Sequence, residues 1–268
     1  MSFVVAPELE KIRHPSESSM LLLRSSLLNQ VEGIEHGFTT RHGGISEAPR
    51  DSLNLGRKLG DSASIIRENR NRVLNALGVP NHTWVSITQV HGNEVVEVTP
   101  NANKAIEADG LWTRSPEAAL AVTVADCVPL LFAHQSGQAV AAVHAGWRGT
   151  VANIAAEMVT RFKKAGFASE ELVVALGPGI GPCCFEIGAE VIEAIEVAFP
   201  SLRSLVKTDG GKGRANLWDM NRIALEKAGI LSSQIDVIDK CTSCTPDLFS
   251  YRRDQGSTGR QAGVIARF

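Results

Sequence analysis

Three positions in this 268-residue chain carry side chains that bind transition metals, and each lies beside a short apolar segment. His91 follows one such segment, Cys127 stands between two, and His144 ends another just before a glycine-containing stretch. Zinc accepts imidazole nitrogen and thiolate sulfur, and a catalytic zinc has three protein ligands and one open position. Because loops at strand ends often carry functional residues, these three form the candidate metal site. Taken singly, each also fits an ordinary structural role, so spacing alone leaves both interpretations open.

Residues near these positions suggest further roles in catalysis. Asp126 precedes Cys127, and we expect it to shuttle protons or to orient the site; the alternative is that it caps a turn. Arg148 lies beside an expected helix N-terminus, and Arg41 lies in a glycine-rich turn. Guanidinium groups and free helix N–H groups both bind phosphate, so each arginine is a candidate phosphate ligand. The alternative for each is a solvated surface side chain.

Hydrophobic patterning indicates which elements position these residues. Short apolar segments predict strands at 34–40, 85–89, 95–98, 119–124, 128–133, 139–144, 172–176, 235–238 and 263–267. Helical spacing and end signals predict helices at 62–77, 146–164, 189–198 and 217–228. The strands cluster without regular helix alternation, which favours an α+β fold over a doubly wound sheet. We expect an N-terminal extension over 1–20 and a single catalytic domain over 21–268.

Composition excludes several classes of partner. The chain has 27 basic and 29 acidic residues and only 5% aromatic residues, so neither a basic stripe nor a base-stacking surface supports nucleic-acid binding. The apolar run near residues 20–28 is interrupted by Arg24 and is too short to span a membrane. Five cysteines at irregular spacing do not form a disulfide framework, so we expect reduced thiols and a cytoplasmic protein.

Two cysteine pairs lie outside the candidate metal site. Cys183 and Cys184 are adjacent, whereas Cys241 and Cys244 have C-x-x-C spacing. Adjacent cysteines do not readily share one zinc in an unstrained turn, and a single C-x-x-C pair is an incomplete four-ligand site. We therefore expect these thiols to pack or to line a loop, with a redox pair as the alternative.

Longer motifs connect the candidate ligands to a known family. They are QVHG (89–92), ADG (108–110), TVADCVP (123–129), AVHAGWRG (142–149), GPGIGPCCFE (177–186) and FSYRRD (249–254). From about residue 33 to the C-terminus, the chain resembles the family described both as laccase-type multicopper polyphenol oxidoreductases and as purine nucleoside phosphorylases. The resemblance implies that His91, Cys127 and His144 are metal ligands. It also implies a single-domain sandwich of mixed sheets flanked by helices.

The resemblance further implies a zinc-dependent purine nucleoside enzyme, with copper as the alternative metal. The implied reactions are phosphorolysis of adenosine, inosine, guanosine and methylthioadenosine, together with deamination of adenosine. The implied partners are therefore a purine nucleoside and phosphate, and the oligomeric state is left open. Three alternatives stand beside this reading: a copper-dependent polyphenol oxidase, a hydrolase that removes misincorporated amino acids from cell-wall precursors, and a non-enzymatic zinc-supported binding module.

Overall fold

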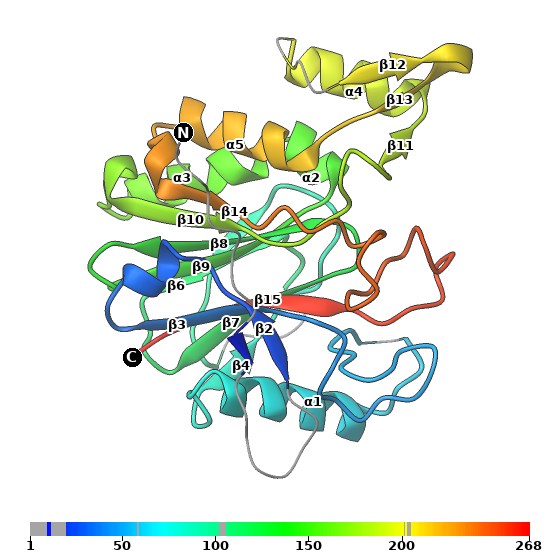
Figure 1. The fold of residues 1–268 in the computed structure, drawn as a ribbon. Helices are drawn as coiled ribbons and strands as arrows, with labels where there is room; N and C mark the ends of the chain where they lie inside the picture. Colours follow the sequence, from blue (N-terminus) through cyan, green and yellow to red (C-terminus); the bar gives the residue numbers. More distant parts are fainter. Residues whose placement is uncertain (1–9, 12–19, 58, 102–105, 201, 203–204) are drawn as a thin grey trace.

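A computed structural model describes the chain except for residues 1–9, 12–19, 58, 102–105, 201 and 203–204. Two six-stranded mixed sheets stack face to face (Figure 1). The first sheet has the order β1 (Glu10–Lys11), β2 (Leu21–Leu23), β3 (Ile34–Thr39), β15 (Gln261–Arg267), β7 (Ala118–Val124) and β4 (Thr83–Val85). The second has the order β14 (Ile235–Val237), β10 (Leu172–Leu176), β8 (Val128–His134), β9 (Val140–Ala145), β6 (Gly110–Thr113) and β5 (Val95–Glu97).

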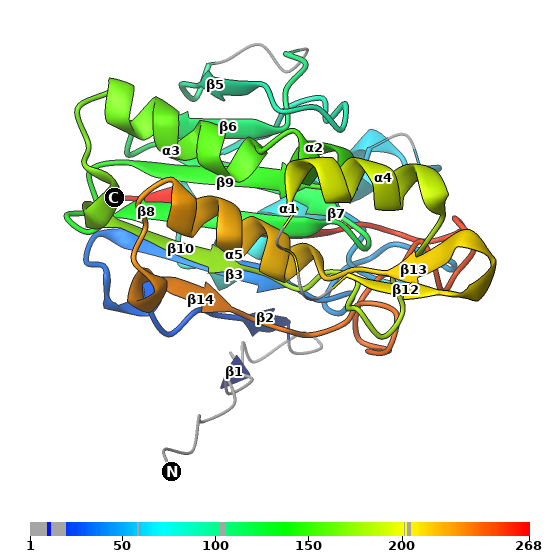
Figure 2. The ribbon, with the colours of Figure 1, turned by 90° about the horizontal axis from the view of Figure 1, so that it is seen from above.

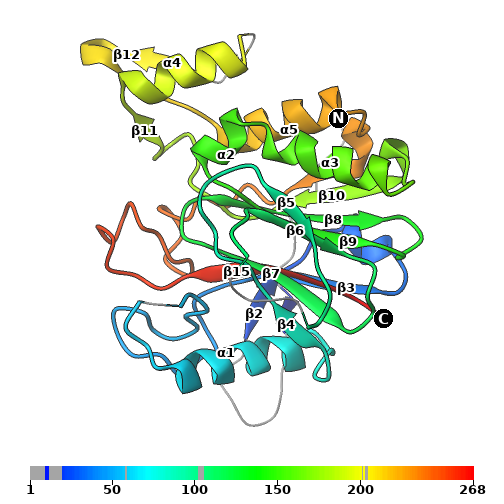
Figure 3. The same ribbon diagram turned by 180° about the vertical axis from the view of Figure 1, so that it is seen from behind.

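Helices cover the outer faces of both sheets. Helix α1 (Ala63–Ala76) lies under the first sheet, whereas α2 (Trp147–Val151), α3 (Ile154–Lys164) and α5 (Leu217–Lys227) lie over the second (Figures 1 and 2). Helix α4 (Ala189–Ala198) extends beyond this layer with a small sheet of β11 (Glu186–Ile187), β13 (Lys212–Arg214) and β12 (Val206–Thr208). Short 3₁₀ helices span Leu28–Gln30, Ser169–Glu171, Asp209–Gly211 and Ser232–Gln234. Figure 3 shows the same layers from behind.

Successive side chains of the central strands point to opposite faces of the sheet and so fill two core layers. In β8, Leu130 and Phe132 pack toward the helices, whereas Leu131 and Ala133 pack against the other sheet. Because successive strand side chains point to opposite faces, a strand covered on both faces must be apolar throughout. Every residue of β8 is buried, which explains why the sequence shows continuous apolar runs here instead of alternation.

The α+β prediction of mixed sheets flanked by helices is confirmed, and most predicted elements match. Helix α1 ends within one residue of its predicted bounds, because the Ser62 hydroxyl accepts a hydrogen bond from the Ile65 N–H and caps it. The predicted helix 146–164 is wrong as a single element. Asn153 adopts a left-handed conformation with φ of 67° and separates α2 from α3. The predicted strand 85–89 is misplaced, since β4 spans Thr83–Val85 and shares only Val85 with it.

The predicted extension at 1–20 falls mostly outside the described residues. Glu10–Lys11 pairs with β2, and Met20 is buried. The boundary at residue 20 therefore stays a prediction. Within the described part of the chain, no helix is both long enough and apolar enough to cross a membrane.

Candidate metal centre

The fold brings the three predicted metal ligands together at one end of the two sheets. Cys127 lies in the turn between β7 of the first sheet and β8 of the second, and His144 is near the end of β9. Pairing of β8 with β9 places Val128 opposite Ala145, which sets Cys127 beside the end of β9. His91 comes from the loop that follows β4. The turn from β7 to β8, which links the two sheets, therefore also places Cys127 beside His144.

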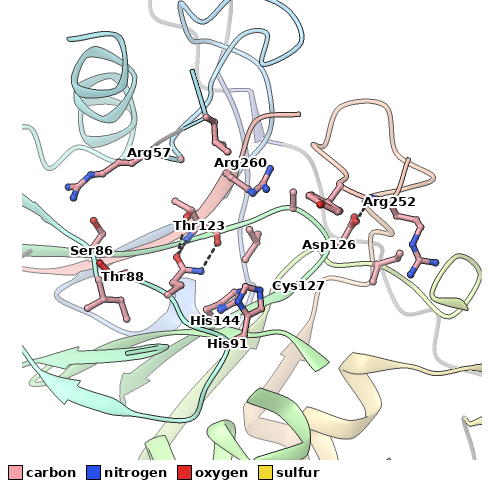
Figure 4. A pocket seen from close by; sticks show the side chains of 18 of the residues that line it. Arg57, Ser86, Thr88, His91, Thr123, Asp126, Cys127, His144, Arg252 and Arg260 are labelled. Atoms are coloured by element: carbon pink, nitrogen blue, oxygen red, sulfur yellow. Dashed lines mark hydrogen bonds between the residues drawn. The ribbon is translucent and has the colours of Figure 1, made fainter. Parts of the chain in front are cut away.

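The donor atoms of this trio are close enough to share one ion. The Cys127 sulfur and one ring nitrogen from each histidine lie within 4.8 Å of one another. The two imidazole rings meet edge to face, with their centroids 4.8 Å apart. Figure 4 shows all three side chains converging at the cavity wall. Two imidazoles and a thiolate with room for an outside ligand are a donor set suited to a transition metal.

Asp109 orients two of the ligands. Its Oδ1 accepts hydrogen bonds from the His91 backbone N–H at 3.0 Å and from the His144 Nδ1 at 2.7 Å. Its Oδ2 accepts from the Val90 and Gly92 backbone N–H groups at 3.2 and 2.6 Å. A carboxylate on Nδ1 fixes the tautomer that leaves Nε2 free for a metal. The backbone bonds also hold His91 at φ of 62°, a conformation uncommon outside glycine.

These contacts perturb the ionisation of the ligands. Burial disfavours the Cys127 thiolate, but the charge and hydrogen bonds of His144 and His91 outweigh it and lower the pKa of Cys127 to about 6. Burial likewise opposes protonation of His144, but the Cys127 thiolate and Asp109 raise the pKa of His144 to about 9. The trio therefore holds a thiolate next to an imidazolium proton that a metal cation would replace.

Gly146 leaves the space in which the ligands meet. A Cβ at this position would lie 3.0 Å from the Cys127 sulfur and 3.2 Å from the His91 Cδ2. Its φ of −75° is open to any residue, so close approach, rather than backbone strain, requires glycine here. The residues present fit a metal ion in both chemistry and space.

Asp126 is fixed by its surroundings. It accepts hydrogen bonds from the Thr242 and Ser250 hydroxyls at 2.6 and 2.7 Å and from the Arg252 backbone N–H at 2.6 Å. These bonds hold Asp126 at φ of 91°, a strained conformation that needs such support. Its carboxylate thus anchors the turn that presents Cys127, which is the turn-capping role that the sequence left open.

A cavity of about 700 Å³ lies over the trio and is lined partly by Asp126. Phe185, Tyr251 and Ile180 contribute apolar surface. The lining also includes four arginines: Arg57, Arg70, Arg252 and Arg260. A cavity of this size suits a small polar organic ligand.

Neither predicted phosphate arginine is among the residues that line this cavity. The Arg41 guanidinium bonds to Asp51 and lies over the Phe249 ring. Arg148 is exposed, with its guanidinium 4.2 Å from the Trp147 ring centroid. The structure places both outside the space that the metal ligands face.

Sequence reasoning missed Asp109 and the cavity arginines. Asp109 stood in a quoted motif without a role, because its contact with His144 depends on the pairing of β6 with β9. Arg70 looks like a helix-surface residue in sequence, yet it is buried. Burial and the positive charge of Arg57 lower the pKa of Arg70 to about 9.

Comparisons with known proteins show which proteins this chain is similar to. The chain is 38% identical over 248 residues to purine nucleoside phosphorylase YlmD of Geobacillus stearothermophilus, covering 88% of this chain and 90% of that protein. It is 38% identical over 237 residues to purine nucleoside phosphorylase YfiH of Escherichia coli, covering 88% and 95%. The crystal structure of YlmD from G. stearothermophilus superposes with a TM-score of 0.87 at 34% identity, covering 97% of this chain and 99% of that one.

A family model described as multi-copper polyphenol oxidoreductase laccase matches residues 35–267. That span contains the three candidate metal ligands, Asp109 and the cavity arginines. The chain therefore belongs to the multi-copper polyphenol oxidoreductase laccase family, whose curated members most similar to it include proteins named purine nucleoside phosphorylase.

Proposed function

We propose that this protein is a zinc-dependent purine nucleoside phosphorylase that also deaminates adenosine. The observation that carries the proposal is that one cavity combines a His–Cys–His metal trio with a cluster of arginines. The names of its relatives support the phosphorylase activity. The proposed phosphorolysis substrates are adenosine, inosine, guanosine and methylthioadenosine. The five free thiols fit the proposed cytoplasmic location.

Arg57, Arg70 and Arg260 are the proposed phosphate ligands. Among the described residues, no carboxylate pairs with any of these three guanidinium groups. The buried Nε of Arg70 has no hydrogen-bond partner. Buried donors without acceptors are rare in folded proteins, and an oxyanion would supply the missing acceptor. Arg252 uses both terminal nitrogens on the backbone carbonyls of Cys184 and Glu186, so we assign it to the loop and not to phosphate. Arg70 and Arg260 each use only one terminal nitrogen on backbone carbonyls.

In the proposed phosphorolysis, a phosphate oxygen forms a bond to the anomeric carbon of the sugar. The bond from that carbon to the purine nitrogen breaks, and the base leaves with the electron pair and takes up a proton. Phe185 and Tyr251 offer aromatic surface for the purine. A zinc ion bound at the trio would supply Lewis acidity toward a substrate oxygen in phosphorolysis and toward water in deamination.

His91, Cys127 and His144 would hold the zinc, with His144 oriented by Asp109. Asp126 would contribute by fixing Cys127, since all three hydrogen bonds to its carboxylate come from the loop 242–252. Arg148 and Arg41 remain the second candidates for the phosphate, through a movement that would bring them to the cavity.

Product analysis tests the proposal. Purified protein is given each nucleoside with and without phosphate, and products are separated by chromatography. We expect free base and the sugar 1-phosphate only with phosphate: ribose 1-phosphate from adenosine, inosine and guanosine, and 5-methylthioribose 1-phosphate from methylthioadenosine. Adenosine should give inosine plus ammonia in either case. The Cys127→Ala variant should form neither. Absence of free base from every nucleoside with phosphate would refute phosphorolysis.

Copper oxidation of phenols is a second candidate, because two histidines and one cysteine also bind copper and the family description names copper. Oxygen uptake with a phenol by copper-loaded and zinc-loaded protein tests it. Phenol oxidation at the rate of nucleoside turnover, only with copper, would favour this candidate over the nucleoside enzyme.

A further inference from the structure

The fold gathers four cysteines that the proposed reaction does not use. Cys183 and Cys184 lie in the loop between β10 and β11, and Cys241 and Cys244 follow β14. Their four sulfur atoms all lie within 4.8 Å of one another. The sequence-based argument against a four-ligand set is therefore wrong about geometry, because the adjacent pair and the C-x-x-C pair face each other.

Backbone pairing explains how two segments about sixty residues apart meet. Gly179 and Cys241 form a parallel β-bridge, and the Thr242 N–H donates to the Gly179 carbonyl at 2.9 Å. The Cys184 N–H donates to the Gly181 carbonyl at 2.9 Å and forms a turn. That turn presents both adjacent cysteines to the other pair.

The sulfur separations match a mononuclear metal site. The Cys244 sulfur lies 3.3 Å from that of Cys184 and 3.6 Å from that of Cys183. A disulfide would require about 2.05 Å, and all four cysteines are free. Tetrahedral zinc with bonds of about 2.3 Å separates its sulfur ligands by about 3.8 Å. Sulfurs that bind different irons of an iron–sulfur cluster lie farther apart than these.

The surroundings supply a backbone donor and two arginines beside the cysteine cluster. The Gly181 N–H donates to the Cys241 sulfur at 3.2 Å. Arg252 donates to the Cys184 carbonyl at 3.1 Å, and Arg253 donates to the Thr242 carbonyl at 2.9 Å. Four thiolates around a divalent cation carry a net charge of −2, and backbone N–H donors and nearby arginines stabilise such a site.

We propose that Cys183, Cys184, Cys241 and Cys244 bind a second zinc ion as a closed structural site. Zinc forms four bonds to sulfur, and the protons of the four thiols go to solvent. Since the protein fills every coordination position, the site takes no substrate.

The second zinc would brace the turn that presents Cys127. The loop that carries Cys241 also supplies Thr242, Ser250 and Arg252 to the Asp126 carboxylate. The other cysteine loop begins beside Ile180, whose N–H donates to the Asp126 carbonyl at 2.7 Å. Both loops that the ion would join thus hold Asp126.

Zinc content tests the proposal directly. Protein purified with reductant, loaded with zinc and freed of excess by gel filtration is analysed for metal. We expect two zinc ions per chain in the parent and one in each double variant, Cys183→Ser with Cys184→Ser or Cys241→Ser with Cys244→Ser. The matched control, Cys127→Ala, should also hold one. One zinc in the parent that the double variants retain would overturn the proposal, as would iron or disulfides at these cysteines.

Cobalt spectroscopy keeps the test valid if the double variants do not fold. Cobalt(II) that replaces zinc shows charge-transfer absorption that grows with the number of bound thiolates. With one thiolate in the first site and four in the second, Cys127→Ala should lose only about one fifth of the absorption. Complete loss of the absorption in Cys127→Ala would contradict a second site.

Discussion

Replacing Asp109 by asparagine separates the shape of the site from its charge. The side chain keeps its size, but one acceptor oxygen becomes an NH₂ donor. Oδ1 faces the His91 N–H and His144 Nδ1, and Oδ2 faces the Val90 and Gly92 N–H groups. Either orientation of the amide therefore sets a donor against two donors and breaks two hydrogen bonds. Asp109 is fully buried, so water cannot replace them.

These contacts predict two effects of Asp109→Asn, one on the free energy of unfolding and one on zinc affinity. Breaking a buried charged pair costs about 3–5 kcal/mol, so the free energy of unfolding should fall by about that amount. Loss of the partner that orients a histidine ligand weakens metal binding by about 10–100-fold, which is about 1.4–2.7 kcal/mol. The two effects are measured separately, by urea unfolding of the metal-free protein and by zinc competition with a chromophoric chelator on folded protein.

Asp61→Asn is the matched control. The Asp61 carboxylate also accepts hydrogen bonds from side chains, those of Ser46, Arg50 and Asn54, and is 4% exposed. None of these three partners of Asp61 is a candidate metal ligand. We expect Asp61→Asn to lose stability while its zinc affinity equals that of the parent. Equal zinc affinity in Asp109→Asn and Asp61→Asn would refute the orienting role of Asp109.

Three further predictions test other parts of the structure. Gly146→Ala should weaken zinc binding at the trio by at least about tenfold, because the new Cβ would meet the ligands. Gly188→Ala, at another helix N-cap with open space around it, should leave zinc binding unchanged. Chelator competition measures the zinc affinity of both variants, and equal affinities would contradict this role of Gly146. Burial, aided by Arg24, lowers the pKa of His36 from 6.5 to about 3. Between these two pH values the unfolded chain binds a proton at His36 that the folded chain does not. The free energy of unfolding should therefore fall by about 1.4 kcal/mol per pH unit as the pH drops from 6.5 to about 3. Urea unfolding as a function of pH should show a flatter dependence in His36→Gln, and an unchanged slope would exclude His36 as its source. Arg260→Met should raise the KM for phosphate by about 10–100-fold, from loss of a charge-assisted bond, and Arg148→Met should leave it near the parent value; the opposite order in steady-state kinetics would assign the phosphate to Arg148.

Local signals in the sequence predicted most of the fold. Capping by Ser62 and the end signals Gly78 and Pro80 set the limits of α1, and apolar runs located the buried strands. The break at Asn153 was missed because Ile154, Met158 and Phe162, which located the helix, all lie after it in α3, and no apolar spacing tested the join to α2. The apolar spacing does not reveal the left-handed backbone of Asn153, because that conformation depends on contacts around the turn.

The three candidate metal ligands could be singled out in the sequence because each stands in a long motif, and the structure brings their donor atoms together. Their partners could not, since those contacts depend on strand order. Asp109 meets His144 only because β6 pairs with β9, and the four cysteines meet only because Gly179 pairs with Cys241. Arg70 lies on the buried face of α1, and it lines the cavity while its neighbours on that face pack against the first sheet. Such contacts between distant segments leave no local signal.

The most direct test of the central claim is to remove the metal and restore it during turnover. Parent protein is stripped with a chelator, and release of base from inosine is followed in phosphate buffer before and after adding zinc. We predict that the stripped protein is inactive, that zinc restores formation of ribose 1-phosphate, and that Cys127→Ala stays inactive after the same treatment. Release of base at the parent rate by the stripped protein, or by zinc-treated Cys127→Ala, would contradict a catalytic centre formed by His91, Cys127 and His144.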